Sequence, residues 1–305
     1  MKPLITILGP TATGKTKLAV QVSQKYGGEI VSADSRQVYR GMDIGTGKDL
    51  SEYIVEGEKI PYHMIDIVDP GYEYNVFKYQ QKAITIIKDI QSRARKVILC
   101  GGSGMYIDAL LKGYKLFPVP ENPPLREKLS SLSDEELSLI LQKYRSLHNK
   151  TDIETKERAI RAIEIEEYYS GHPELQETST ALPSVIFGLC GDRDVIRNKI
   201  TSRLRERLAS GMIEEVRKLL EAGVDAEQLI RYGLEYKYIT LFLLKEIGYD
   251  DMFQKLNIAI HQFSKRQMTW FRKMERDGFL IHWIDIAFPD EKKLEIIDTT
   301  LEFKS

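Results

Sequence analysis

The sequence predicts an α/β protein in which helices flank a largely parallel sheet and an all-helical segment interrupts that sheet. Three observations support this prediction. Short apolar runs recur along the chain, and two of them lead through glycines into a helix-like stretch. Four prolines within residues 118–124 then precede a charged helical region. A last apolar run, Ser184–Cys190, returns the chain to the sheet.

The elements follow from these patterns in order. The sequence predicts a strand at Leu4–Leu8, a helix at Lys15–Tyr26, and further strands at 29–33 and 96–100, the last followed by a helix that runs to Leu111. The prolines are expected to break regular structure before helices that extend to about residue 169, and 170–183 are expected to form the returning loop. No internal repeat is present. We therefore expect a catalytic core of residues 1–118 and 184–305 and a helical insertion of residues 119–183.

Composition limits the function classes. The 305 residues are 42% hydrophobic and 29% charged, which suits a globular chain with a sizeable core. The formal net charge is -1, so a nucleic-acid partner would have to be held by local basic patches. Gly9 and Pro10 interrupt the N-terminal apolar run before a signal peptide or membrane span could form, which predicts a cytoplasmic protein without a membrane partner.

The cysteines and histidines favour neither a disulfide nor a zinc site. Cys100 and Cys190 lie far apart and beside apolar residues, as buried thiols in a reducing compartment do. The five histidines have no partner at a spacing typical of zinc ligands.

The strongest motif is a phosphate-binding loop. GPTATGKT at residues 9–16 fits G-x-x-x-x-G-K-[ST] and lies between a predicted strand and a predicted helix. Backbone N–H groups and the helix N-terminus can hold a di- or triphosphate, Lys15 adds a charge, and Thr16 adds a hydroxyl for Mg²⁺. The predicted diphosphate-binding residues are Gly9, Pro10, Thr11, Ala12, Thr13, Gly14, Lys15 and Thr16. Nucleotide hydrolases, kinases and other diphosphate-using enzymes share such loops, so the motif leaves the reaction open.

A carboxylate at the same sheet edge is the candidate catalytic group. The strand 96–100 ends in cysteine and two glycines, without the acid that phosphate-loop hydrolases place there. Asp34 closes the apolar run IVSAD, and the carboxyl ends of parallel strands gather ligands. From spacing alone, Asp34 is as compatible with capping a following helix as with a role in the site.

A basic helix is predicted at residues 192–210. An apolar stripe of Ile196, Ile200, Leu204 and Leu208 runs along it. A stripe of cations lies beside it, formed by Lys199, Arg203 and Arg207, whereas Arg193, Arg197 and Arg205 are expected to be solvated. The cation stripe could meet phosphates at the rim of a site, although a solvated basic face explains most of it.

A second basic helix is predicted at residues 264–276. It mixes cations with Trp270 and Phe271, which is compatible with stacking on RNA. Burial of Met268, Phe271 and Met274 on one face of an amphipathic helix explains the aromatic residues equally well.

Six motifs in this order resemble the bacterial transfer-RNA dimethylallyltransferase (tRNA isopentenyltransferase) family. They are GPTATGKT, DSRQVYRGMDIGTGK, YHMIDIVDP, GGSGMYIDALL, ERAIRAIEI and KRQMTWFR, and together they span nearly the whole chain. The DSRQVYRGMDIGT block is the most specific, because a phosphate-loop ATPase has no reason to carry it. The resemblance implies a P-loop NTPase-like sheet with an all-helical insertion, acting as a monomer.

The resemblance also implies the reaction. A dimethylallyl group would pass from dimethylallyl diphosphate to the exocyclic amine of the adenine 3′ of the anticodon, and diphosphate would leave. By motif position, Lys15 and Thr16 hold the diphosphate with Mg²⁺, Asp34 is the general base, and Arg203 assists the diphosphate. The implied partners are the tRNA anticodon stem-loop and dimethylallyl diphosphate.

The matched positions imply RNA contacts as well. They are Asp34, Ser35, Arg36, Gln37, Ser103, Arg126, Glu157, Arg158, Ala159, Ile160, Arg161, Arg231, Tyr232, Gly233, Leu234, Glu235 and Tyr236. Two of these places depart from the common pattern: the family usually has threonine where Ser103 stands, and RYGLEY differs from R-x-V-G-Y-R/K.

Three other functions remain open from the residues. A small-molecule kinase or ATPase needs only the loop, a prenyltransferase acting on free adenine nucleotides shares the core, and an RNA-binding module could sense phosphate without chemistry. The motif block argues against the first, and the helical insertion with the basic helices favours RNA over free nucleotides.

Overall fold

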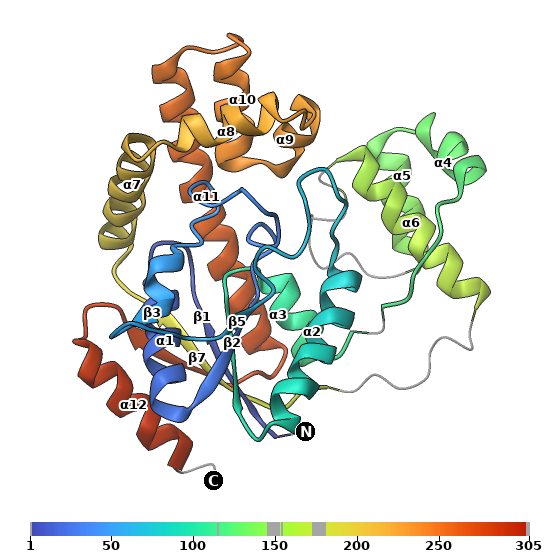
Figure 1. Ribbon diagram of the computed structural model, residues 1–305. Helices are drawn as coiled ribbons and strands as arrows, with labels where there is room; N and C mark the ends of the chain where they lie inside the picture. Colours follow the sequence, from blue (N-terminus) through green and yellow to red (C-terminus); the bar gives the residue numbers. More distant parts are fainter. Residues whose placement is uncertain (1, 115, 145–152, 154, 173–180, 303–305) are drawn as a thin grey trace. The chain divides into compact units, whose positions relative to one another are not determined.

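The chain divides into two compact units. The computed structural model describes residues 2–114, 116–144, 153, 155–172 and 181–302. The core unit comprises Met1–Gly113 and Ala181–Ser305, and the insertion unit comprises Tyr114–Thr180 (Figure 1). The bounds of the insertion unit differ by a few residues from the 119–183 expected from the sequence. The returning loop expected at 170–183 lies largely outside the described residues.

A six-stranded parallel sheet forms the centre of the core unit, as the sequence predicts. The strand order is β5-β2-β6-β1-β7-β8, and every neighbouring pair is parallel. The strands are β1 (Leu4–Leu8), β2 (Gly28–Ser32), β5 (Tyr62–His63), β6 (Lys96–Gly101), β7 (Ser184–Cys190) and β8 (Ile281–Asp285). Strands β1 and β2 are separated by β6, so the chain crosses over a strand between them, and ligands commonly bind at such a point.

Helices cover both faces of this sheet because its strands carry apolar residues on each side. On one face, Ile5 and Ile98 pack with α1 (Lys15–Tyr26) and α12 (Asp290–Glu302). On the other face, the core includes residues of α2 (Val76–Ser92), α3 (Gly104–Leu111) and the C-terminal half of α11 (Tyr249–Arg276). Fully burying each such aliphatic side chain contributes roughly 1.5 to 3 kcal/mol.

A group of helices at the C-terminal end of the chain builds a separate core. It contains α7 (Arg193–Ala209), α8 (Met212–Glu221), α9 (Ala226–Tyr232), α10 (Leu234–Leu243) and the N-terminal half of α11. The side chain of Asp192 accepts hydrogen bonds from the backbone of Asp194 and Val195, which starts α7 where the sequence predicts a helix. Val38 and Met42, which follow β2, are buried in the same core.

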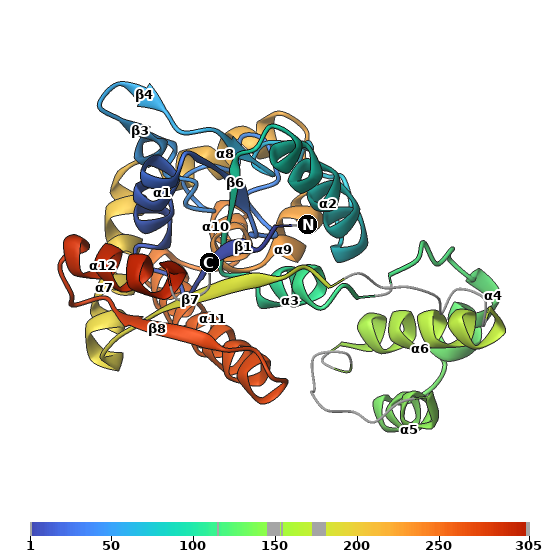
Figure 2. The same ribbon diagram turned by 90° about the horizontal axis from the view of Figure 1, so that it is seen from below.

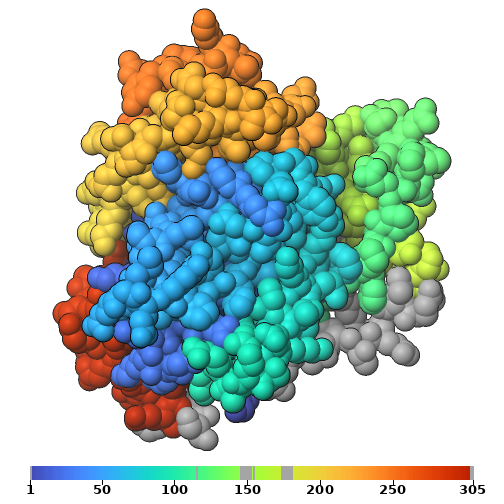
Figure 3. Space-filling view, viewed as in Figure 1, coloured from blue at the N-terminus to red at the C-terminus, as the bar shows by residue number. Residues whose placement is uncertain are grey.

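The segment after β2 has little regular structure and is held by a buried lysine. Lys48 is fully buried, donates to the Tyr39 carbonyl at 2.7 Å, and pairs with Asp43 and Asp66. The short elements that follow are the 3₁₀ helix η1 (Leu50–Tyr53) and the hairpin of β3 (Ile54–Val55) and β4 (Glu58–Lys59). Residues 34–70, blue to light blue in Figure 3, form much of the visible face of the core unit.

The described part of the insertion unit is helical. It contains α4 (Pro123–Ser130), α5 (Asp134–Tyr144) and α6 (Lys156–Gly171), which Figure 2 shows side by side. Leu137, Leu141 and Ile163 form its small core. The expectation that every proline breaks regular structure is wrong at Pro123 and Pro124, because they occupy the first turn of α4, where a missing N–H costs no helical hydrogen bond.

No helix among the described residues is both long and apolar enough to cross a membrane.

Candidate active site

Three strand ends converge at one edge of the core sheet. Strands β1, β6 and β2 are neighbours, and the phosphate-binding loop, the glycine pair 101–102 and Asp34 follow them in turn. A Cβ on Gly101 would lie 2.1 Å from the Ala33 carbonyl oxygen, so only glycine lets the end of β6 approach the end of β2 this closely. The sheet thus brings the predicted phosphate loop and the predicted base to the same edge.

The loop at residues 9–16 has the strand, turn and helix that the motif predicts. Helix α1 begins at Lys15, directly after the left-handed Gly14. The Thr13 hydroxyl and the Lys15 ammonium both donate to the Pro10 carbonyl, at 2.8 and 2.6 Å. These bonds close the loop around the first turn of the helix, whose N–H groups favour an anion.

Electrostatics single out Lys15 within the loop. Lys15 is half-buried, and burial lowers its pKa to about 8. Cys100 and Asp34 oppose this shift and Arg203 adds to it, so all three lie within electrostatic range of the ammonium. The neighbouring thiol is inert, because burial raises the pKa of Cys100 to about 12. Both cysteines are free, as expected.

A residue that the sequence did not indicate contacts the phosphate loop, and phosphate binding by Thr11 stays a prediction. The Thr11 N–H donates to the side-chain oxygen of Gln267 at 2.9 Å, so this amide is already bonded. The Gln267 amide nitrogen in turn donates to the Gly102 carbonyl at 2.9 Å. Gln267 therefore ties the loop after β1 to the loop after β6, and α11 supplies that tie.

Asp34 lies in a turn, not before a helix. Its Oδ1 accepts a hydrogen bond from the Arg36 N–H at 2.9 Å, and residues 35–38 form a turn. The helix-capping alternative is therefore wrong. Asp34 is half-buried and raises the pKa of Lys15, so its carboxylate lies within electrostatic range of the phosphate loop.

Arg203 and Arg207 project from α7 toward the same site. Arg203 is hydrogen-bonded to the carboxylate of Asp49, and Arg207 approaches the same oxygen at 3.4 Å. Burial lowers the pKa of Arg207, Arg203 lowers it further, and Asp49 acts in the opposite direction. Ile200 and Leu204 are buried as expected. The remaining cations of this helix, Lys199, Arg193, Arg197 and Arg205, are exposed.

Ser103 and Gln37, two residues that are predicted to contact RNA, form hydrogen bonds within the protein near Asp34. The Ser103 hydroxyl accepts from the Ser35 N–H at 3.0 Å, which fixes the backbone after Asp34. Gln37 accepts from the Ser32 hydroxyl at 2.9 Å and donates to the Gly47 carbonyl at 3.2 Å, so both ends of its side-chain amide are bonded. Base contacts by Gln37 are therefore not favoured.

The second predicted RNA segment, at residues 231–236, is also partly internal. Tyr232 and Tyr236 are 5% and 2% exposed. The Tyr232 hydroxyl accepts a hydrogen bond from the Gly71 N–H at 2.7 Å, and the Tyr236 hydroxyl donates to the Glu215 carboxylate at 2.7 Å. Gly233 precedes α10, and Gly233 and Leu234 both have positive φ angles, of 77° and 44°. The prediction of RNA contact by the two tyrosine side chains is thus wrong, because both are packed in the helical core.

The same segment carries two charged residues. Glu235 lies near the site, and Arg231 lies at the surface. Burial raises the pKa of Glu235, and the negative charge of Asp34 raises it further. The positive charges of Arg207 and Arg203 lower it. Glu235 therefore faces the same cluster as the proposed base. Arg36, which lies over the Tyr232 ring at 5.3 Å, borders this region.

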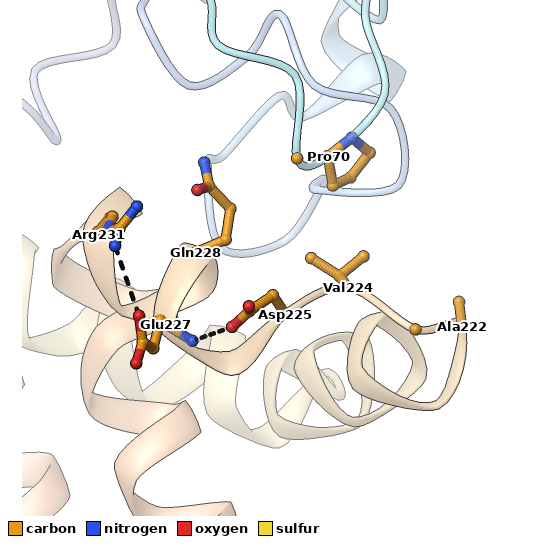
Figure 4. A pocket seen from close by; sticks show the side chains of 9 residues that line it. Pro70, Ala222, Val224, Asp225, Glu227, Gln228 and Arg231 are labelled. Atoms are coloured by element: carbon orange, nitrogen blue, oxygen red, sulfur yellow. Dashed lines mark hydrogen bonds and ion pairs between the residues drawn. The ribbon is translucent and has the colours of Figure 1, made fainter. Parts of the chain in front are cut away.

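Arg231 lines an open hollow of about 420 Å³ between the loop at residues 70–71 and the turn from α8 to α9 (Figure 4). Its side chain is 71% exposed and approaches Glu227 at 3.4 Å. Asp225, also at the hollow, accepts from the Glu227 N–H and starts α9. Arg231 is accessible to a partner, and its predicted RNA contact stays a prediction.

In the insertion unit, a buried carboxylate holds two of the predicted RNA-contacting arginines. Glu164 is 2% exposed and accepts hydrogen bonds from Arg126, Arg161 and the Asn122 N–H. Burial alone would raise the pKa of Glu164, but the two arginines outweigh it and lower the pKa to about 2. About a third of each arginine side chain is still exposed, so RNA contact by these two remains a prediction.

The other residues of α6 that are predicted to contact RNA are partly buried and partly exposed. Ala159 and Ile160 are 3% and 9% exposed and belong to the core of the insertion unit, so contact of their side chains with RNA is a wrong prediction. Glu157 and Arg158 are exposed. The period of the helix explains the division, since neighbouring residues point to different faces.

The basic helix at residues 264–276 is the amphipathic end of α11. Phe271 and Met274 are buried and Met268 packs against the same core, as the amphipathic interpretation predicts. Trp270 packs on Gly104, where a Cβ would lie 2.4 Å from the ring. The exposed cations of this stretch are Lys265, Arg266, Arg272 and Arg276, and their contact with RNA stays a prediction.

The residues near the loop fit a magnesium ion that is held mainly by phosphate. Mg²⁺ commonly takes one or two protein oxygens and completes its shell with phosphate and water. The Thr16 hydroxyl and the Asp34 carboxylate are oxygen donors at this edge, and the described residues include no cluster of three or more acidic, histidine or cysteine side chains that could hold a metal alone.

Comparison with known proteins decides the family. The family model described as IPP transferase matches residues 37–274. The chain belongs to the IPP transferase family. It is 54% identical over 299 residues to a protein of Bacteroides fragilis named tRNA dimethylallyltransferase 2, with 98% of each chain covered. It is 56% identical over 292 residues to tRNA dimethylallyltransferase 1 of Parabacteroides distasonis, with 95% of each chain covered.

Solved structures of IPP transferases share the fold. A tRNA isopentenylpyrophosphate transferase from Bacillus halodurans aligns with a TM-score of 0.72 at 29% identity and covers 100% of this chain and 97% of its own. A eukaryotic dimethylallyltransferase described as acting on tRNA aligns with a TM-score of 0.75 at 23% identity, over 94% of this chain and 74% of its own, which supports the fold alone. The P-loop-like α/β sheet predicted from the sequence is confirmed.

Proposed function

We propose that this chain is a tRNA dimethylallyltransferase, which transfers the dimethylallyl group of dimethylallyl diphosphate to N6 of the adenosine 3′-adjacent to the anticodon. One observation carries the mechanism: the Asp34 carboxylate lies at the same sheet edge as the phosphate loop and acts electrostatically on Lys15. A base and a diphosphate cradle are thereby placed together. The names of the full-length relatives support the substrate class.

The cationic side of the site would hold the leaving diphosphate. The loop at 9–16 offers the N-terminus of α1, Lys15 supplies an ammonium, and Arg203 approaches from α7 within electrostatic range of Lys15. Negative charge gathers on the diphosphate as the carbon–oxygen bond breaks, so fixed cations stabilise the transition state more than the ground state. Thr16 would hold Mg²⁺, which neutralises further charge on the diphosphate when it is bound.

The anionic side would activate the acceptor. The lone pair of an adenine N6 amine is drawn into the ring, so this nitrogen is a weak nucleophile and needs a base that takes its proton as the new carbon–nitrogen bond forms and the carbon–oxygen bond to diphosphate breaks. Asp34 Oδ1 accepts a hydrogen bond from the Arg36 N–H, which orients the carboxylate. We assign the removal of the N6 proton to this carboxylate.

The acceptor adenine must leave its stack to reach the sheet edge, which favours an unpaired nucleotide in a loop. Exposed cations suited to the RNA backbone are Arg231, Arg266 and Arg272 in the core unit and Arg158 in the insertion unit. We assign the anticodon stem-loop to these surfaces and the insertion unit to its recognition. We further propose that the enzyme works as a cytoplasmic monomer.

A transfer assay tests this function. The protein is incubated with Mg²⁺, labelled dimethylallyl diphosphate, and one acceptor at a time: unmodified tRNA, AMP or ATP. We expect label in tRNA alone. Label in AMP or ATP would establish a free-nucleotide prenyltransferase, ATP turnover without RNA would establish a kinase or ATPase, and tRNA binding without transfer would establish an RNA-binding module.

A further inference from the structure

The cation pair of α7 is bridged by a single carboxylate. Asp49 is hydrogen-bonded to Arg203 and lies 3.4 Å from Arg207. The side chains of Arg203, Arg207 and Asp49 are 32%, 15% and 38% exposed, so the cluster is recessed without being closed to solvent. Within the described ranges, Asp49 is the carboxylate that hydrogen-bonds to either arginine.

The turn that carries Asp49 is built against the two arginines. A Cβ on Gly47 would lie 1.8 Å from Arg207 Nη2 and 2.8 Å from Arg203 Nη2, so a side chain at this position would displace the two guanidinium groups from where they lie, and the φ of +64° also favours glycine. The Gly47 carbonyl accepts from Gln37, and the adjacent Lys48 is buried in its ion pairs. Asp49 itself adopts a left-handed conformation, with φ 44° and ψ 51°. These contacts fix where its carboxylate lies.

The bridge competes with the ligand expected at this site. Carboxylate and phosphate oxygens are the two anionic partners that arginine binds through the same planar set of N–H donors. A diphosphate on the loop at residues 9–16 would lie beside Lys15, which is within electrostatic range of Arg203. Arg203 cannot direct the same N–H groups to Asp49 and to the diphosphate.

We propose that Asp49 is an internal counter-anion of the diphosphate site, which holds Arg203 and Arg207 in place and which the substrate's diphosphate displaces from Arg203. The inference rests on the proposed function only in taking diphosphate as the ligand. Asp49 is thus a positioning residue that keeps two cations recessed and lowers the affinity for the leaving group, which favours product release.

Binding of inorganic diphosphate with Mg²⁺ tests this inference by isothermal titration calorimetry on the full chain. In Asp49→Asn the side chain keeps its size and loses its charge. We expect diphosphate to bind roughly three- to tenfold more tightly, because the displaced interaction is a partly exposed ion pair shared by two arginines. Asp251→Asn is the matched control: it removes the same charge from an exposed pair with Lys255 on α11, and it should leave the affinity unchanged.

Unchanged or weaker diphosphate binding in Asp49→Asn would overturn the proposal, since a purely structural aspartate predicts one of these results. Thermal unfolding checks that the variant is folded, and Asp49→Ser must give the same tightening if Asp49→Asn does not fold. The proposed function can fail separately. If Asp49→Asn binds diphosphate more tightly but the native chain does not transfer the prenyl group to tRNA, the role of Asp49 as counter-anion would be supported and the proposed reaction would be refuted.

Discussion

The side chain of Gln267 accepts a hydrogen bond from the Thr11 N–H across 256 residues of sequence. Its other end donates to the Gly102 carbonyl at 2.9 Å. A single buried amide on α11 therefore sets the distance between the phosphate loop and the loop after β6. The helical end of the chain thus takes part in shaping the sheet edge where the chemistry is proposed.

Replacing Gln267 by methionine should loosen the phosphate loop. The variant keeps the side-chain length but leaves the Thr11 N–H and the Gly102 carbonyl without these partners, at a cost of about 1 to 3 kcal/mol. We expect the dissociation constant of Mg²⁺-diphosphate to rise about tenfold, as measured by calorimetry. Gln262→Met, at an exposed position of the same helix, should bind diphosphate normally. Equal binding by the two variants would show that the tie has no role in the loop.

Asp34→Asn tests the role of Asp34 as a base without removing the hydrogen bond that Asp34 makes in its turn. Asparagine keeps a side-chain oxygen that can accept from the Arg36 N–H, so the turn should persist. A general base contributes roughly 10²- to 10⁴-fold, so prenyl transfer in single-turnover assays should fall by that factor while diphosphate binding remains. Asp34→Ala should lose transfer to a similar extent and also lose the turn hydrogen bond. Near-normal turnover by Asp34→Asn would remove Asp34 from the mechanism.

The parts of the site that are local in sequence could be predicted. The strand, loop and helix around Lys15 lie within one run of residues, so the motif and its flanks were sufficient to place them. Asp34 followed from a general property of parallel sheets, whose strands end at a common edge. The limits of Leu4–Leu8, Lys15–Tyr26 and Ser184–Cys190 agree with the apolar patterns for the same reason.

The parts that depend on distant partners could not be predicted. Gln267 meets Thr11 only after the whole sheet has formed, and its helix pattern indicates burial without indicating a partner. Gln37 and Tyr236 lie in motifs that suggest contact with RNA, yet their polar groups satisfy Gly47 and Glu215 inside the protein. Polar residues in a motif can serve the fold as well as the ligand, and only the contacts distinguish the two.

Diphosphate binding should weaken as the pH rises through about 8. Burial lowers the pKa of Lys15 to about 8, so the ammonium is charged below that pH and loses its proton above it. A neutral amine attracts diphosphate less, and calorimetry between pH 7 and 9.5 should record the decline. Lys15→Arg keeps its charge across this range and controls for the titration of diphosphate itself. The same pH dependence in both proteins would assign the effect to the ligand and not to Lys15.

Glu164 should control the stability of the insertion unit in acid. Its pKa is lowered to about 2 in the folded protein, against about 4.3 for an unperturbed glutamate. The carboxylate therefore contributes its full stability above about pH 4.5, and this contribution is lost as the pH falls toward 2. Because Arg126 and Arg161 are about one third exposed, we expect Glu164→Gln to cost about 2 kcal/mol at neutral pH, less than a fully buried pair.

Hydrogen exchange in the full chain measures this effect where it arises. Glu164→Gln should lower the protection of backbone amides in α4 and α6 at pH 7. Glu164 lies on α6 with Arg161, and it accepts hydrogen bonds from Arg126 of α4 and from the N–H of Asn122, the N-cap of α4. Glu167→Gln removes the same charge from an exposed position of α6 and should leave the protection unchanged. If both variants exchange like the native chain, the two arginines do not depend on Glu164 for their positions, and they would be free to reorient toward RNA.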